Sequence, residues 1–180
     1  MVPEARLEQL PTGLAPVTDG WFTVNVRDAA WVTNEALGAA GIFEGEGPSF
    51  PDVGFTMAVI QPGQPSGMYH SEANQENFLV LAGECLAIIE GEERRLKAWD
   101  FVHCPGGTEH AFVGAGEGPC VIFMTGGRTH EKRVTYHRSE AALRHGAGPE
   151  ADTNDGNVAY APFPEWKDGP PPSWEGLPWA

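Results

Sequence analysis

Four residues in the middle of the chain have side chains that could bind a metal ion. His70, Glu72 and Glu76 follow one another at short spacing, and His110 lies further along the chain. Two imidazoles with one or two carboxylates suit iron, manganese, nickel, cobalt or zinc better than calcium. The sequence therefore predicts a site for a divalent transition metal, with these four residues as candidate ligands.

The sequence around these residues favours their convergence on one point. Residues two apart in a strand point to the same face, so His70 and Glu72 share a direction if their segment is extended. Glu76 opens the next apolar run, and a Pro-Gly-Gly turn precedes His110. His70, Glu76 and His110 alone would leave coordination positions open for substrate or oxygen. Glu72 is then a fourth ligand, a neighbour of the ligands that does not touch the ion, or a base.

The segments that must position these residues have the pattern of an all-β domain. From Trp21 onward, short runs of β-branched and aromatic residues alternate with Gly, Pro, Asn or Asp. Many short strands with tight turns favour a sandwich or barrel. The expected strands are residues 22–27, 55–61, 76–82, 85–90, 94–99, 101–104, 109–113 and 120–125.

The end of the chain has a different composition. Ser139 is expected to cap a short helix over residues 140–144, which Gly146 would end. The segment beyond is rich in Pro, Gly and Asp, which excludes regular structure, but its tryptophans predict an extended tail anchored on the barrel or on a neighbouring subunit. The expected organisation is an N-terminal extension (1–20), a barrel (21–137), and a short helix with an extended tail (138–180).

Composition limits the possible partners and location. A chain of 180 residues with a net charge of −14 fits one domain and lacks the basic block that a nucleic-acid or anionic-membrane partner needs. The N-terminus has neither a signal-peptide pattern nor a membrane span. Cys85, Cys104 and Cys120 are odd in number and far apart, which indicates reduced thiols. We expect a cytoplasmic protein whose partner is a small molecule, a cation or another copy of itself.

The residues from Gly63 to His110 resemble the two sequence motifs of the cupin superfamily. In the first motif a glycine precedes a His-x-His pair, a glutamate and a closing glycine; the corresponding residues are Gly63, His70, Glu72, Glu76 and Gly83. In the second, Pro-x-Gly precedes a histidine, and the corresponding residues are Pro105, Gly107 and His110. The resemblance covers roughly residues 54–125 and implies an antiparallel double-stranded β-helix, the jelly-roll cupin barrel.

The resemblance implies metal ligands at His70, Glu76 and His110. Glu72 stands where the family usually has a second histidine, and a carboxylate there should favour harder ions. Gly114 replaces an asparagine that often follows the last histidine. The resemblance also implies a small-molecule ligand and a homodimer, because exposed edge strands need covering.

Three functions stay open at this point. The first is a metal-dependent enzyme, of oxygenase, isomerase or lyase type, in which Glu72 is a ligand or a catalytic base. The second is a binding or sensing protein that uses the metal as an anchor, and the third is a barrel that the ion only stabilises. An enzyme needs an open coordination position and a pocket that solvent can reach, whereas a structural site is closed.

The other residues of these types have simpler interpretations. His103 is expected at the barrel rim or in the core, hydrogen-bonded to a neighbour, and Cys104 is expected to be a packed core residue. His130, His137 and His145 lie near the expected helix and are given no role.

Overall fold

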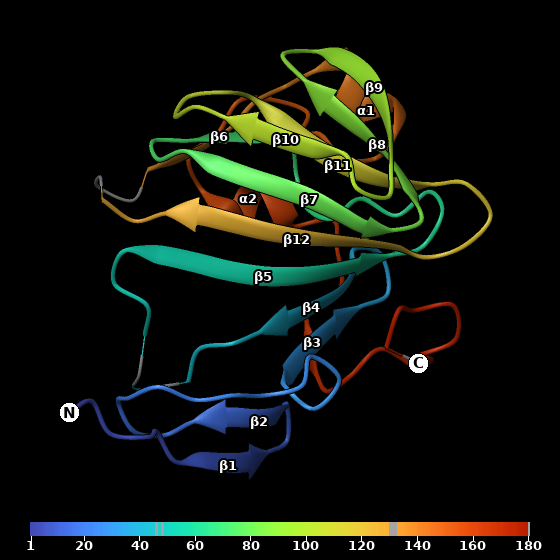
Figure 1. Cartoon of the computed structure of the whole chain (residues 1–180). Helices are drawn as coiled ribbons and strands as arrows, with labels where there is room; N and C mark the ends of the chain where they lie inside the picture. Colours follow the sequence, from blue (N-terminus) through green and yellow to red (C-terminus); the bar gives the residue numbers. More distant parts are fainter. Residues whose placement is uncertain (46, 48, 130–132, 180) are drawn as a thin grey trace.

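A computed structural model describes residues 1–45, 47, 49–129 and 133–179 of the chain. The described strands form three sheets in which neighbouring strands run antiparallel (Figure 1). The seven-stranded sheet has the order β10 (Phe101–Cys104), β7 (Glu76–Ala82), β12 (Cys120–Gly127), β5 (Val53–Ile60), β4 (Gly38–Ile42), β3 (Ala30–Asn34) and β14 (Lys167–Asp168). The five-stranded sheet has the order β13 (Val134–Tyr136), β6 (His70–Glu72), β11 (His110–Ala115), β8 (Glu84–Ile89) and β9 (Glu92–Lys97). A separate hairpin contains β1 (Leu7–Leu10) and β2 (Gly13–Pro16).

The barrel interior lies between the two larger sheets. Ile60 of β5 and Phe78 of β7 contribute to it from one sheet, and Phe112 of β11 contributes from the other. Successive residues of a strand point to opposite faces. Met57 and Val59 of β5 accordingly belong to a second cluster on the outside of the seven-stranded sheet. The alternation in the sequence thus yields the predicted all-β jelly-roll barrel.

A short helix covers the outside of the five-stranded sheet. Helix α1 (Glu140–Arg144) packs Ala141 and Ala142 against a cluster that includes Val113 of β11. The side chain of Ser139 caps the helix by accepting a hydrogen bond from the backbone N–H of Ala142. Gly146 follows with a φ of 65°, in the left-handed region that suits a helix end. The prediction of this helix and its cap is confirmed.

The last part of the tail lies against the outside of the seven-stranded sheet. The rings of Trp174 and Trp179 lie 5.6 and 6.1 Å from the ring of Trp31, which is fully buried. The prediction that the tail excludes regular structure is wrong in two places. Asp155 caps helix α2 (Gly156–Tyr160), and strand β14 pairs with β3. A side-chain cap and an available sheet edge are enough to order these short segments.

The predictions for the segment before β5 were also partly wrong. Residues 22–27 do not form a strand, because the Asn25 side chain accepts from the N–H of Arg27 and its carbonyl accepts from Asp28, which bends the chain. Strands β3 and β4 were not predicted. The sequence of β4 is Gly-Ala-Ala-Gly-Ile. A Cβ on Gly41 would lie 3.0 Å from the Trp31 ring, so the strand has a residue without a side chain where it passes the indole.

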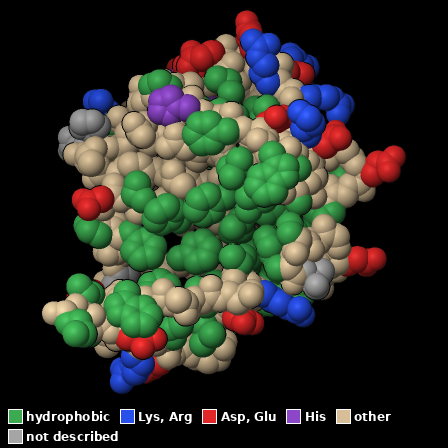
Figure 2. Space-filling view, viewed as in Figure 1, with side chains coloured by type: hydrophobic (Ala, Val, Ile, Leu, Met, Phe, Trp, Pro, Cys, Tyr) green, Lys and Arg blue, Asp and Glu red, His purple; other side chains and the backbone are tan. Residues whose placement is uncertain are grey.

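One face of the molecule is largely apolar. Figure 2 shows hydrophobic side chains gathered over the long strands β5, β12 and β7, with charged side chains mostly at the periphery of that view. Strand β10 forms the edge of this sheet, and Phe101 on it and Trp99 before it are exposed. No helix in the described part of the chain has the length and apolar character needed to span a membrane.

Candidate metal centre

Two of the four candidate ligands come from neighbouring strands of the five-stranded sheet. His70 begins β6, His110 begins β11, and the two residues are paired directly across the ladder. The centroids of their rings lie 4.8 Å apart. The turn before β11 is held by Gly107, whose N–H donates to the carbonyl of Glu72 at 2.7 Å. This turn fixes the start of β11 beside β6, as the turn sequence predicted.

The third candidate ligand comes from the opposite sheet. Glu76 begins β7, and its Oε2 atom lies 3.4 Å from Nε2 of His110. One donor atom each from His70, Glu76 and His110 lie within 4.8 Å of one another. Three donors from two sheets thus meet inside the barrel, an arrangement in which a single cation could contact all of them.

Hydrogen bonds to the backbone determine which nitrogen of each imidazole is free. Nδ1 of His70 lies 2.6 Å from the carbonyl oxygen of Met68, and Nδ1 of His110 lies 3.1 Å from that of Thr108. A carbonyl only accepts, so each Nδ1 carries the proton when the ring is neutral. The lone pair of each Nε2 is then available to a metal, the usual arrangement for histidine ligands.

Burial controls the charge of the group. It lowers the pKa of His110 to about 4, with a further contribution from His70, and it lowers the pKa of His70 as well. It also raises the pKa of Glu76 to about 8, with a further contribution from the Glu72 carboxylate. At neutral pH and without a cation, both rings are neutral and Glu76 is mostly protonated. A divalent ion would compensate the buried carboxylate charge, so this donor set fits a metal.

Glu72 lies beside this group rather than in it. Its Oε1 atom is 4.0 Å from Nε2 of His70, and it lines a cleft of about 750 Å³ next to the centre. The cleft is lined among others by Thr56, Glu72, Asn74, Glu76, Met124 and Arg128. Glu76 and Met124 also line a smaller cavity, of about 110 Å³, whose wall includes both histidines. The metal group therefore adjoins a space large enough for a small organic molecule.

An ion pair stands at the rim of this cleft. The Arg128 guanidinium binds Glu44 through two contacts of 2.7 Å and donates to the carbonyl of Phe50. It holds the pKa of the Glu44 carboxyl below its usual value. A Cβ on Gly54 would lie 2.6 Å from the guanidinium, so glycine leaves room for it.

His103 and Cys104 lie on β10, and neither belongs to the group of three donors, although Cys104 is paired with Glu76 across the β10–β7 ladder. Nδ1 of His103 is 2.7 Å from the Asn77 side-chain oxygen, and the residue is exposed on β10, as expected of a rim histidine. Cys104 is buried in the barrel core, where burial raises the pKa of its thiol to about 11. This thiol is a packed core residue, as the sequence analysis favoured.

The remaining histidines differ from one another. His145 pairs with Glu93 on the surface, whereas His130 lies outside the described residues. Nε2 of His137 lies 2.9 Å from Oγ of Ser71, and its Nδ1 lies 3.6 Å from Glu109. The sequence analysis gave His137 no role and so missed these contacts. They join Ser71 on β6 to Glu109, the residue before β11. No pattern in the sequence signals it, because Ser71 and His137 become neighbours only when β13 pairs with β6.

The tail supplies a cavity residue that the sequence analysis also missed. Tyr160, at the end of α2, lines the smaller cavity together with both histidines. Its only sequence signal is the presence of widely spaced aromatics beyond residue 146.

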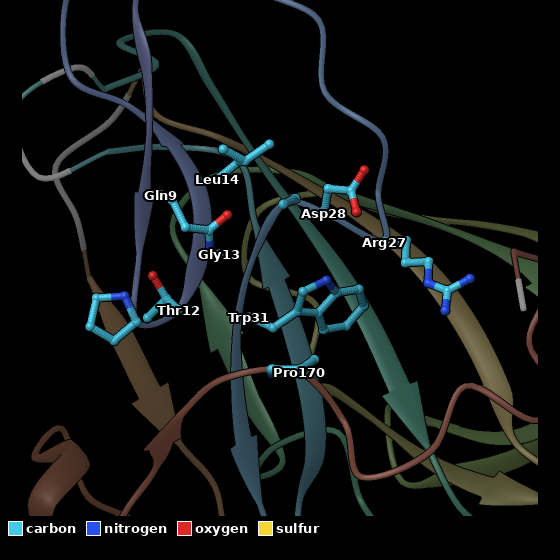
Figure 3. Close-up of a pocket in the computed structure, with 10 residues that line it drawn as sticks. Gln9, Thr12, Gly13, Leu14, Arg27, Asp28, Trp31 and Pro170 are labelled. Carbon is cyan, nitrogen blue, oxygen red and sulfur yellow. The ribbon is translucent and has the colours of Figure 1, made fainter.

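A third cavity, of about 400 Å³, lies between the N-terminal hairpin and the tail (Figure 3). Thr12, Asp28, Trp31 and Pro170 are among the residues that line it. The side chains of Arg27 and Asp28 point in different directions in Figure 3, so this cavity lacks the convergent donors of the metal centre.

Comparison with known proteins agrees with the fold. The family model described as the cupin domain matches residues 56–126. The polyketide cyclase RemF from Streptomyces resistomycificus is similar with a TM-score of 0.53 at 14% identity, over 62% of this chain and 81% of RemF. A sugar phosphate isomerase of the cupin superfamily from Silicibacter pomeroyi DSS-3 has a TM-score of 0.49 at 20% identity, over 57% of this chain and 65% of that one. The DMSP lyase DddQ from Ruegeria pomeroyi DSS-3 has a TM-score of 0.42 at 25% identity, over 50% of this chain and 46% of the lyase. No curated protein sequence matches the chain.

The match to the cupin domain model and the likeness to RemF establish the fold and leave the reaction open. At 14% identity, the likeness to RemF shows the fold alone. The chain spans less than two thirds of the lengths of the isomerase and the lyase. The predicted resemblance to cupins and the predicted jelly-roll barrel are nevertheless confirmed.

Proposed function

Given the cupin domain in residues 56–126, we propose that the chain is a metal-dependent enzyme acting on a small organic molecule. His70, Glu76 and His110 would hold a divalent iron, manganese, nickel, cobalt or zinc ion. The observation that supports this most directly is the convergence of three donor atoms within 4.8 Å, from two sheets. The bonds from both Nδ1 atoms to backbone carbonyls add support, because they leave both Nε2 lone pairs free.

Three protein ligands leave coordination positions for water or substrate. When bound, such an ion supplies Lewis acidity, or one-electron chemistry if it is redox-active. The protein residues contribute the remainder of the site. The two histidines are fixed by their hydrogen bonds, and Phe78 and Phe112 give the cavity apolar walls that exclude water.

We assign Glu72 the role of a base that acts on substrate in the adjoining cleft. Its carboxylate lies next to His70 and also lines that cleft. The side chain is 28% exposed, so a proton that it accepts can pass to solvent. A base must lie within hydrogen-bonding reach of the proton that it removes, and a substrate held beside His70 would satisfy this condition.

Elemental analysis tests the metal assignment. The protein would be purified without a histidine tag, beside the His70→Ala/His110→Ala double variant. We expect about one equivalent of a transition metal in the parent and none in the variant. If neither protein contained metal and neither took it up on reconstitution, the proposal would be wrong.

A metal-free binding pocket is the second candidate. The raised pKa of Glu76 favours it, because a protonated Glu76 can donate a hydrogen bond toward Nε2 of His110, 3.4 Å away. The three groups would then form a neutral, hydrogen-bonded pocket for a polar ligand.

We also propose that two copies associate. Strand β10 leaves one edge of the seven-stranded sheet unpaired among the described strands, and Phe101 on it is 63% exposed. Unpaired edges with apolar side chains favour association. Light scattering should give about twice the chain mass of 19.4 kDa.

A further inference from the structure

The tail of the chain forms part of the wall of the metal cavity. Tyr160 lines the cavity of about 110 Å³ beside His70, Glu76 and His110. It does so although it lies at the end of α2, which follows the barrel strands in the sequence. Asp155 caps this helix, and Tyr136 on β13 packs edge-on against the Tyr160 ring at 5.7 Å. The ring is therefore held in place from both α2 and the barrel.

The position of the Tyr160 hydroxyl is also fixed. The backbone N–H of Met68 donates to it at 3.0 Å. A Cβ added to Gly67 would lie 3.0 Å from the same oxygen. Met68 and Gly67 both line the cavity, so the hydroxyl lies at the cavity wall.

This hydroxyl has an unused donor. A tyrosine hydroxyl has one proton to donate and can accept hydrogen bonds through its oxygen. The bond from Met68 uses the oxygen as an acceptor, and among the residues that the structure describes no acceptor is recorded for the Tyr160 proton. Burial raises the pKa of Tyr160, which keeps the hydroxyl protonated at neutral pH.

The other cavity walls make such a donor useful. Phe78, Phe112 and Met124 offer no donor, and the N–H groups of both histidines are bonded to backbone carbonyls. Besides Tyr160, Ser66 contributes a hydroxyl to the lining. A ligand beside the histidines would lose its hydrogen bonds to water on entering this space. A hydroxyl on the wall can replace one of them.

We propose that Tyr160 donates a hydrogen bond to an anionic oxygen of the substrate, such as a carboxylate, held beside His70, Glu76 and His110. This inference rests on the proposed function, because the ion that His70, Glu76 and His110 would hold brings the anion into the cavity. The tail is then part of the binding site, and Tyr160 selects ligands that carry a hydrogen-bond acceptor next to the atom that binds the metal.

Azide binding to the cobalt-loaded protein tests this role without requiring the natural substrate. Azide is a small anion that accepts hydrogen bonds, and its binding changes the visible absorption of protein-bound Co²⁺. In Tyr160→Phe we expect the azide Kd to rise about tenfold, the usual effect of losing a hydrogen bond to a charged ligand, with Co²⁺ affinity unchanged. Gly67→Ala should raise the Kd by a smaller factor, because the added Cβ displaces the hydroxyl without removing it.

Tyr136→Phe is the matched control. The variant keeps the ring that packs against Tyr160 and lies 5.9 Å from the His70 ring centroid, and it removes a hydroxyl of a residue that does not line the cavity, so its azide Kd should equal that of the parent. Equal azide affinity in Tyr160→Phe, Gly67→Ala and the parent would show that Tyr160 is only a wall. If the parent showed no visible bands with Co²⁺ at all, the proposed metal site would fail, and this inference with it. If the azide Kd rose in Tyr160→Phe and Gly67→Ala but not in Tyr136→Phe, and the cobalt bands stayed intact, the result would support both the metal site and the role of Tyr160.

Discussion

Nε2 of His110 lies 3.4 Å from Oε2 of Glu76, yet burial moves the pKa values of the two groups in opposite directions, to about 4 and about 8. The pair therefore prefers its neutral form when no cation is present. A cation would reverse this preference at Glu76, because a carboxylate must lose its proton to bind a metal. The stability of the metal-free protein should consequently depend on pH in a defined way.

We predict that the free energy of unfolding of the metal-free protein falls above pH 6.5. The raised pKa of Glu76 stabilises the fold fully below its ordinary value of 4.5, and this contribution is lost as the pH rises toward 8. The lowered pKa of His110 acts oppositely, since its contribution is complete above 6.5 and is lost as the pH falls toward 4. Above pH 6.5 the remaining gain from His70 and His110 is small and only partly offsets the loss at Glu76, so the net loss by pH 8 should be about 1 kcal/mol.

Urea unfolding of chelator-treated protein between pH 6 and 8.5 would measure this loss. Glu76→Gln, which has no carboxyl proton, should remove most of the decline. An equal decline in the parent and in this variant would mean that Glu76 is ionised in the metal-free fold.

Glu72→His should change the metal preference of the centre. Glu72 lies 4.0 Å from Nε2 of His70, so an imidazole there could add a third nitrogen ligand. Nitrogen donors favour zinc and cobalt over manganese, and we expect the zinc-to-manganese ratio after competitive reconstitution to rise at least roughly threefold. Metal analysis by mass spectrometry would measure the ratio.

Glu72→Gln is the control for this prediction, because it keeps the size of the side chain without adding an imidazole nitrogen. If Glu72→His left both the metal content and the coordination spectra unchanged, position 72 would lie out of reach of the ion.

The parts of the fold that follow from local patterns could be predicted from the sequence. Alternation marked β5, β7 and β12, and the turn glycines marked where the chain reverses. The meeting of His70, Glu76 and His110 followed from the same logic, because each residue begins a strand next to a turn. Position at a strand start is a local property, so one sequence is sufficient to suggest it.

The missed parts depend on tertiary contacts. Strand β4 consists mainly of glycine and alanine, which have low strand propensity, and its Gly41 is explained by the Trp31 ring, which leaves no room for a larger side chain there. Tyr160 reaches the cavity through the packing of α2 against Met68 and Tyr136. Neither contact has a periodic signal along the chain, so neither could be inferred before the fold was known.

The contact between Ser71 and His137 should help to position the metal ligands. Ser71 lies between His70 and Glu72 on β6, and its Oγ is hydrogen-bonded to His137. His137 also faces Glu109, the residue before His110. Loss of groups that orient a ligand directly costs about 10- to 100-fold in metal affinity, and this contact acts one residue further away. We therefore expect His137→Ala to weaken Co²⁺ binding by roughly threefold to tenfold.

Competition with a chromophoric chelator would measure the Co²⁺ affinity of this variant. His145→Ala is the matched control, since His145 makes a comparable contact with Glu93 on the surface, away from the metal centre. Equal affinities in the two variants would show that the Ser71–His137 contact has no influence on the centre.

The tail tryptophans should contribute unequally to stability. Trp174 packs edge-on against Trp31, at 5.6 Å, and lies under Arg27, whose guanidinium carbon is 5.8 Å from the ring. Trp166 is 42% exposed, and no ring contact is recorded for it among the described residues. Removing a partly buried aromatic ring that packs on the core should cost about 2 kcal/mol, below the range for fully buried rings, so Trp174→Ala should lower the free energy of unfolding by that amount. Trp166→Ala should change it by less than about 0.5 kcal/mol, as surface substitutions usually do. Chemical unfolding of both variants would measure the difference, and equal losses would mean that the tail does not depend on the Trp31 contact to stay on the barrel.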